Sequence, residues 1–259
     1  MIATTKADFY RLFRTKGFWI SQFIIIGIIF ISIASQAVGQ VGVNLEESAQ
    51  EIESQFSMQW TGVTSVEAIT SMMGIFFYTM LPMMVIIIGH DFSKKTYKNI
   101  LTVGVSRTKY FLAQYISFAM MIFLQVFYIY AVSFLTGTLF YGVGDGFNSK
   151  QLLNWLFVGI IQFLMIMAIL TISCFVTYLT KNSVLAILTA IFIQLLIPIM
   201  SFIFKDINWI NHFDFYNLMG ETSFLLNKSG EMYQSTFAAL GTIIVFLLIT
   251  IIQFNKSEL

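Results

Sequence analysis

The chain has 259 residues, of which 58% are apolar and only 10% are charged, and its mean hydropathy is +0.81. Soluble domains contain roughly 25% charged residues, so this composition predicts a membrane protein. The net charge of +1 gives no general attraction to nucleic acid. Cys174 is the single cysteine and lies in an apolar run, which excludes a disulfide framework or a cysteine metal cluster.

Residues 1–16 predict an amphipathic helix lying at the membrane interface. Its expected apolar face carries Ile2, Phe9, Leu12 and Phe13. The opposite face, turned to water, would carry Asp8, Arg11 and Arg14. The alternative is a secretory signal sequence, but the apolar run that follows is longer than the roughly 7–15 residues typical of one.

Six apolar stretches are long enough to cross a bilayer core of about 30 Å. They cover residues 18–38, 72–89, 110–141, 152–179, 184–204 and 236–254. Pro82 stands in the middle of the second stretch and predicts a kink there, because proline removes a backbone donor and crowds the preceding turn. The centre of every stretch lacks Asp, Glu, Lys, Arg and His, which disfavours an intramembrane enzyme or an ion-coupled carrier.

Two polar segments are predicted to lie outside the cell. Residues 39–68 carry five glutamates and no lysine or arginine, and a capping pattern at Asn44 and Glu47 predicts a short acidic helix. Such a helix is either a simple solvated face or a vestibule that attracts cations. Residues 205–235 are rich in aromatic side chains, which favour membrane interfaces. His212 and Asp214 lie close together in that segment, but two residues are weak evidence for a metal site.

The polar segment between the second and third apolar stretches, residues 90–109, is strongly basic. It contains Lys94, Lys95, Lys98, Arg107 and Lys109 against the single acid Asp91. Its apolar residues recur at helix-like spacing, and Ser93 is placed to cap a short amphipathic helix on the membrane surface. The alternative is a solvated loop that only sets the topology.

The distribution of charge predicts that both termini are cytoplasmic. With that orientation only Lys150, Lys205 and Lys228 of the 14 basic residues lie outside. Only Asp8, Asp91 and Glu258 of the 13 acidic residues then lie inside. This asymmetry follows the positive-inside rule.

Residues 90–109 resemble the loop between the second and third membrane helices of ABC-2 type transporter permeases. The matching positions are Asp91, Thr96, Lys98, Asn99, Ile100, Leu101, Ser106 and Arg107. The departures are Lys95 where the family has glycine, Gly104 where proline is common, and Gln114 where lysine is common. The hydropathy pattern of the whole chain agrees with that family.

The resemblance implies an all-α integral membrane protein like a type V exporter. Its parts would be six transmembrane helices, an N-terminal interfacial helix, a cytoplasmic coupling helix at 90–109 and an extracellular re-entrant segment at 205–235. The coupling helix would dock into a separate ABC ATPase subunit through Asp91, Lys95, Thr96, Asn99, Leu101 and Arg107. The chain has no P-loop motif, so ATP and Mg would bind the partner ATPase and this chain would bind no cofactor. A second permease copy or a related permease would complete the complex in a bacterial plasma membrane.

The expected function is export of amphipathic peptides or hydrophobic compounds, with catalysis left to the ATPase. The pathway candidates are uncharged polar residues within the apolar stretches: Gln22, Gln125, Gln162 and Gln194. The alternative is that these glutamines only form hydrogen bonds between helices. The alternative function is a non-transporting membrane sensor, immunity or scaffold protein.

Overall fold

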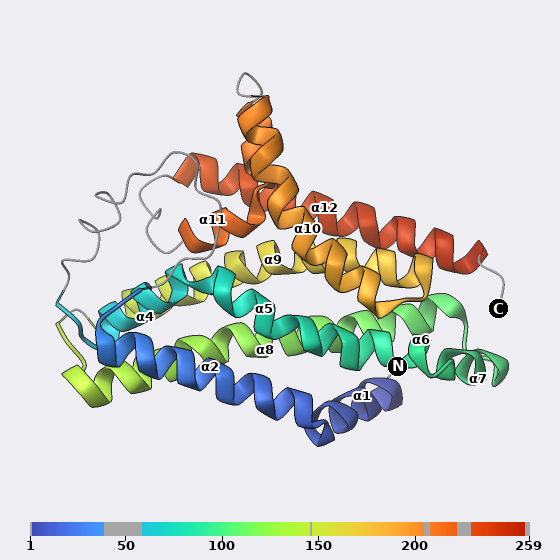
Figure 1. The fold of residues 1–259 in the computed structure, drawn as a ribbon, viewed down its shortest axis with the longest axis horizontal. Coiled ribbons are helices and arrows are strands. Elements are labelled where there is room, and N and C mark those ends of the chain that lie inside the picture. The colour runs from blue at the N-terminus through green and yellow to red at the C-terminus, as the bar shows by residue number, and fades with distance from the viewer. Residues whose placement is uncertain (1, 39–58, 146, 205–207, 222–228, 257–259) are drawn as a thin grey trace.

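The structure, a computed structural model, describes residues 2–38, 59–145, 147–204, 208–221 and 229–256. Throughout those ranges the regular structure is helical, and six helices are long and apolar enough to cross a membrane. The long helices lie roughly side by side, except for α10, which is splayed away from the others at one end (Figure 1). The chain is therefore an all-α protein with the character of a multi-pass membrane protein.

The helices have the following bounds: α1 Ile2–Arg14, α2 Lys16–Ser35, α4 Gly62–Ser71, α5 Met73–Met84, α6 His90–Ser93, α7 Thr96–Thr102, α8 Arg107–Tyr141, α9 Ser149–Thr180, α10 Ser183–Ile203, α11 Phe215–Glu221 and α12 Ser229–Lys256. A π-helical turn, η1, covers Val85–Gly89, and a 3-10 helix, η2, covers Asn208–Phe213.

Helices α8 and α9 form the centre of the bundle. In the most apolar part of α9, 67% of the residues are buried, against 17% in α12. Helix α9 packs against α8, α10, α11 and α12, while α8 packs against α1, α2 and α4. The 35 residues of α8 extend over ~52 Å at 1.5 Å per residue, so α8 is longer than the ~30 Å apolar core of a bilayer.

The six predicted stretches coincide with long helices to within a few residues at most ends, and two differences stand out. The segment assigned to the first external loop is helical from Gly62, because Thr61 and Thr64 exchange capping hydrogen bonds at the start of α4. Helix α12 begins at Ser229, seven residues before the predicted start. The predicted acidic helix after Asn44 lies outside the described residues.

Helices α4 and α8 pack closely because small residues meet between them. A Cβ atom added at Gly137 would lie 2.4 Å from Ser65 Oγ and 3.2 Å from the Cα atom of Gly62. The first backbone amides of α4 also donate hydrogen bonds beyond the end of α8, from Gly62 to the carbonyl of Gly142 at 2.8 Å. This backbone pairing uses helix-end donors that would otherwise lack partners.

The second membrane helix is irregular just after its proline in the sequence. Pro82 lies within α5, and the chain passes into the π-helical turn at Val85 before α6 begins at His90. A proline removes one i→i−4 hydrogen bond, and π turns are a recognised form of helix irregularity. The sequence placed a kink at the proline, and the irregularity that the structure records lies one turn later.

The central loop forms two short helices. Helix α6 ends at Ser93 and α7 begins at Thr96, so the prediction that Ser93 caps the helix is wrong. Lys95 occupies the position before α7 with a φ of 57° and makes no side-chain capping bond. A positive φ favours glycine, which is the residue that the resembling family has at this position.

Replacing Lys95 with glycine should therefore stabilise the fold by about 0.5–1 kcal/mol, because the left-handed conformation strains a residue that has a Cβ atom. The matched control is Lys94→Gly, since Lys94 has a φ of −90° and should lose stability on the same change. Denaturant unfolding of both variants in detergent measures the difference. Equal effects at the two positions would contradict the argument.

The segment predicted as re-entrant contains two short helices in its described part, η2 and α11, as well as the first turns of α12. Phe215, Tyr216 and Met219 of α11 are buried against the bundle. Asp214 accepts hydrogen bonds from the backbone and side-chain nitrogens of Asn217 at the start of α11. Burial raises the pKa of Asp214, and the two bonds from Asn217 oppose that shift.

Candidate functional site: a buried charge cluster beside the central loop

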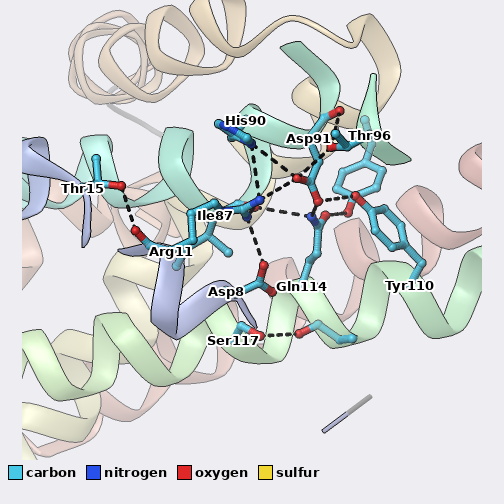
Figure 2. Close-up of polar contacts among 12 residues, drawn as sticks. Asp8, Arg11, Thr15, Ile87, His90, Asp91, Thr96, Tyr110, Gln114 and Ser117 are labelled. Carbon is cyan, nitrogen blue, oxygen red and sulfur yellow. Dashed lines mark hydrogen bonds and ion pairs between the residues drawn. The ribbon is translucent and has the colours of Figure 1, made fainter. Parts of the chain in front are cut away.

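Asp91 is the centre of a polar network that joins four helices (Figure 2). Its side chain is buried, and the residue is 5% exposed. One carboxylate oxygen accepts from Arg11 of α1 at 2.6 Å and from the Thr96 hydroxyl of α7 at 3.1 Å. The other oxygen accepts from the Tyr110 hydroxyl at 2.8 Å and from the Gln114 amide at 2.6 Å, both on α8. We call these residues, together with Asp8, the Asp91 cluster.

The Arg11 guanidinium serves two carboxylates at once. Its Nη1 donates to Asp91, and its Nη2 donates to Asp8 Oδ1 at 3.0 Å. Nη2 also donates to the backbone carbonyl of Ile87 at 2.9 Å, within the π-helical turn. His90 Nδ1 lies 3.4 Å from Nη1. Arg11 therefore ties α1 to the irregular end of the second membrane helix.

Asp8 is the less stabilised of the two carboxylates. It is 4% exposed, and its Oδ2 atom has no hydrogen-bond partner in the described part of the chain. Burial raises the pKa of Asp8 to about 6, and the negative charge of Asp91 adds to this shift, while Arg11 and, to a smaller extent, the nearby Ser117 hydroxyl oppose it. Asp8 thus differs from Asp91, which has four donors around it.

These contacts correct the predicted orientation of α1. The sequence placed Asp8 and Arg11 on the water-facing side, whereas both turn inward beside the buried Leu12. Phe13, which shares the predicted apolar face with Leu12, is 47% exposed. The prediction failed because the charges of α1 are matched by one another and by Asp91, a partner 80 residues further along the chain.

Aromatic side chains cover the cluster on its α9 side. The Tyr178 hydroxyl donates to Gln114 Oε1 at 2.6 Å, so Gln114 joins Asp91 to α9. The Tyr178 ring makes edge contacts with Phe92, Phe111 and Phe254 at centroid distances of 4.8, 4.9 and 5.0 Å.

Arg107 binds the end of the last helix. Its Nη1 donates to the carbonyls of Phe254 and Asn255 at 3.1 and 2.8 Å. The neighbouring Thr108 exchanges hydrogen bonds with the Asn255 side chain. A cation at the carboxyl end of a helix is favoured by the helix dipole, so the start of α8 holds the end of α12.

The six residues predicted to contact an ATPase occupy different environments. Lys95 and Asn99 are exposed, while Leu101 is partly buried and packs against the core. Asp91 and Thr96 point into the cluster, and Arg107 points to α12. The ATPase contact itself stays a prediction.

The four glutamines that were proposed to line a pathway form hydrogen bonds between helices, and they do not lie together in one site. The side-chain amides of Gln22 and Gln125 exchange hydrogen bonds of 2.9 and 3.3 Å. Gln162 accepts from Tyr130 and donates to the carbonyls of Thr70 and Met219. Gln194 accepts from Tyr78. Interhelical hydrogen bonds of this kind hold membrane bundles together. The contacts therefore match the interpretation that these glutamines join helices, rather than the one that they line a pathway.

One site formed jointly by Asp8, Arg11, Tyr110 and Gln114 was not predicted from the sequence. The available signal was a lone acid, Asp91, among five basic residues, together with a carboxylate and an arginine one turn apart on α1. Within the described ranges no group of three or more His, Cys, Asp or Glu side chains is placed to hold a metal ion. The cluster can instead hold charge and bind or release a proton.

Comparison with known proteins gives one positive finding. A family model with the description "Protein of unknown function (DUF2705)" matches residues 18–259, which is most of the chain. A search of the curated proteins finds no match.

Proposed function

Because the chain belongs to the DUF2705 family, whose description assigns no activity, we propose a function from its sequence and helix arrangement. The protein is the transmembrane permease subunit of an ABC exporter. It pairs with a separate ATPase subunit and with a second permease, and it lies in a bacterial plasma membrane with both termini in the cytoplasm.

The observation that carries the proposal is the surface of the central loop. Helix α7 lies at the end of the bundle that also holds α1 and the carboxyl end of α12 (Figure 1). Its free side presents Lys95 and Asn99, and Val103 directly after it is 85% exposed. A short helix with polar groups and an uncovered apolar residue, between two membrane helices, fits a docking element for a soluble subunit.

The contacts behind α7 give a route for coupling. Tyr97 of α7 is buried against Phe92, and Thr96 donates to Asp91. Asp91 in turn is bonded to α1 and α8. In the proposed mechanism, ATP binding closes the ATPase pair and displaces α7. These contacts pass the displacement to the membrane helices, and the pathway then opens outward.

The proposed cargo is an amphipathic peptide or a hydrophobic compound. The support is the sequence of the spans, which holds no charged residue at their centres for an ion or a sugar acid. The second candidate is a non-transporting sensor, immunity or scaffold protein. It is favoured by the bonding of all four glutamines between helices rather than along a pathway.

The proposal predicts that a gene beside this one encodes an ABC ATPase, and the test is to express the two chains together and to measure ATP hydrolysis of the complex in nanodiscs. Cationic amphipathic peptides should stimulate hydrolysis in the unchanged complex. Val103→Glu should weaken ATPase binding by tenfold or more, about 1.4 kcal/mol, because it places a charge where an apolar contact is expected. Leu101→Glu is a less clear test, since Leu101 also packs on the core.

The matched control is Val143→Glu, the same change in the exposed turn between α8 and α9. It should leave ATPase binding unaltered. Equal binding by the Val103 and Val143 variants would remove α7 as the docking element. A chain that binds no ATPase and inserts normally would favour the non-transporting function.

The orientation has its own prediction. Ser93 and Ser149 are exposed at opposite ends of the bundle. In a Cys174→Ser background, a cysteine at Ser149 should react with a membrane-impermeant reagent in intact cells, and one at Ser93 should react only after lysis. Labelling of the Ser93 cysteine from outside would contradict the predicted orientation.

A further inference from the structure

We propose that Asp8 is a proton-binding site and that its protonation controls how firmly α1 is held against α6 and α8. A protonated Asp8 favours the docked helix, and an ionised Asp8 favours its release. The proposal concerns the Asp91 cluster alone and holds whether or not the protein transports anything.

The geometry gives the cluster more acid than base. One guanidinium, that of Arg11, lies between two buried carboxylates at 2.6 and 3.0 Å. Two carboxylates that share one cation in a buried site are most stable when one of them carries a proton. With both ionised, the group would keep an uncompensated negative charge away from water, which is costly.

The hydrogen bonds indicate which carboxylate takes the proton. Asp91 accepts from Arg11, Thr96, Tyr110 and Gln114, and such donors stabilise an ionised carboxylate. Asp8 accepts from Arg11, the adjacent Ser117 hydroxyl donates to the Ala113 carbonyl and stabilises the Asp8 carboxylate only weakly, and Asp8 Oδ2 meets no donor in hydrogen-bonding geometry among the described residues. The proton therefore belongs on Asp8, and the raised pKa of that carboxyl, about 6, agrees.

The charged and titratable groups that face Asp8 come from four elements. Arg11 lies on its own helix, and His90 and Asp91 lie on α6. Tyr110 lies on α8 and Tyr178 on α9. His90 Nδ1 is 3.6 Å from Asp91 Oδ1, and its side chain is 44% exposed. His90 is a second ionisable group beside Asp91, so a His90 variant is needed to separate its effect from that of Asp8.

Helix α1 is the element that can move. It is joined to α2 through the single residue Thr15, and its polar contacts with the cluster all pass through Arg11. Asp91, by contrast, is held by α7 and α8 as well. Withdrawal of α1 would return Asp8 to water and lower its pKa towards the model-peptide value of 3.8.

The direction of the pH effect follows from linkage. The docked state has the higher pKa, so it binds the proton more tightly, and docking is strongest at low pH. Docking weakens as the pH rises from about 3.8 through about 6 and levels off about one pH unit higher. The same linkage predicts that the released fraction rises about tenfold between about pH 5 and about pH 7.5.

Release can be measured at Ser117, a buried residue of α8 that lies beneath Asp8 (Figure 2). In a Cys174→Ala background in nanodiscs, a cysteine at Ser117 should react with a small methanethiosulfonate only when α1 withdraws. A cysteine at the exposed Lys109, also on α8, corrects for thiol ionisation and reagent chemistry. The ratio of the two rates should rise about tenfold over that pH range.

Two variants test which group is responsible. Asp8→Asn cannot ionise, so its rate ratio should be low and independent of pH, while His90→Gln should keep the pH dependence. A full pH response in Asp8→Asn, or an unchanging or undetectable reaction at Ser117 in the unaltered cluster, would overturn the proposal.

Infrared spectra give a readout that does not depend on α1 motion: the unaltered chain should show a carboxylic acid that titrates near pH 6 and that Asp8→Asn lacks. Absence of that carboxylic acid would refute the proton site.

Discussion

Replacing Asp91 with alanine should reduce the free energy of unfolding by about 3–5 kcal/mol, because it leaves several buried hydrogen-bond donors without their acceptor, at a cost of about 1–3 kcal/mol for each buried group. The change would leave the Arg11 guanidinium facing only Asp8. It would also remove the acceptor of the Tyr110 hydroxyl, the Gln114 amide and the Thr96 hydroxyl. Denaturant unfolding in detergent, followed by circular dichroism, measures the loss.

The control for Asp91 is Asp145→Ala, which removes an exposed carboxylate in the turn after α8 and should change stability by less than about 0.5 kcal/mol. A second check is the double variant with Arg11→Ala. Because the two residues are bonded, the second substitution should cost much less in the Asp91→Ala background than alone. Additive losses would show that the two side chains act independently.

Replacing Gly137 with alanine should destabilise the protein by about 1–3 kcal/mol, the usual cost of forcing extra volume into a packed contact. The new methyl group would lie 2.5 Å from Ser65 Cβ and 3.2 Å from the Gly62 backbone, so α4 would have to move away from α8. The same unfolding assay measures the loss.

Gly241 of α12 is the matched control for Gly137, because a Cβ atom there meets nothing within 4 Å. Gly241→Ala should be neutral or should stabilise by up to about 1 kcal/mol, since alanine favours helix more than glycine does. A loss of stability at Gly241 as large as that at Gly137 would show that the cost comes from the helix backbone rather than from packing.

Hydropathy was sufficient to predict the long helices. Uninterrupted apolar runs of about 18 or more residues have few alternatives to a membrane helix, and α2, α8, α9 and α10 lie close to their predicted ranges. Hydropathy missed α4, whose sequence mixes Thr, Ser and Glu with apolar residues. That helix is stabilised by the capping pair Thr61 and Thr64 at its start and by its contact with α8. The capping pair is local in sequence, whereas the contact with α8 exists only in the folded protein.

The Asp91 cluster was harder to predict, because its members lie far apart in the sequence. A helical projection of α1 puts charged residues on the water side, and that rule failed for Asp8 and Arg11. Their partner, Asp91, is 80 residues from Arg11. Single-sequence reasoning locates an unusual acid, but the pairing of one charge with another across helices depends on tertiary packing.

The π-helical turn at Val85–Gly89 also sets the rotational phase of the residues that follow it. Each residue of an α-helix advances the side-chain direction by about 100°, and a π turn accommodates one residue more per turn than the α-helix does. Deleting one residue from this turn would restore a regular helix and rotate His90–Ser93 by about that angle. Asp91 would then face away from Arg11, although no residue of the cluster had been changed. The position of Asp91 in the cluster therefore depends on the length of this turn as much as on the identity of its side chains.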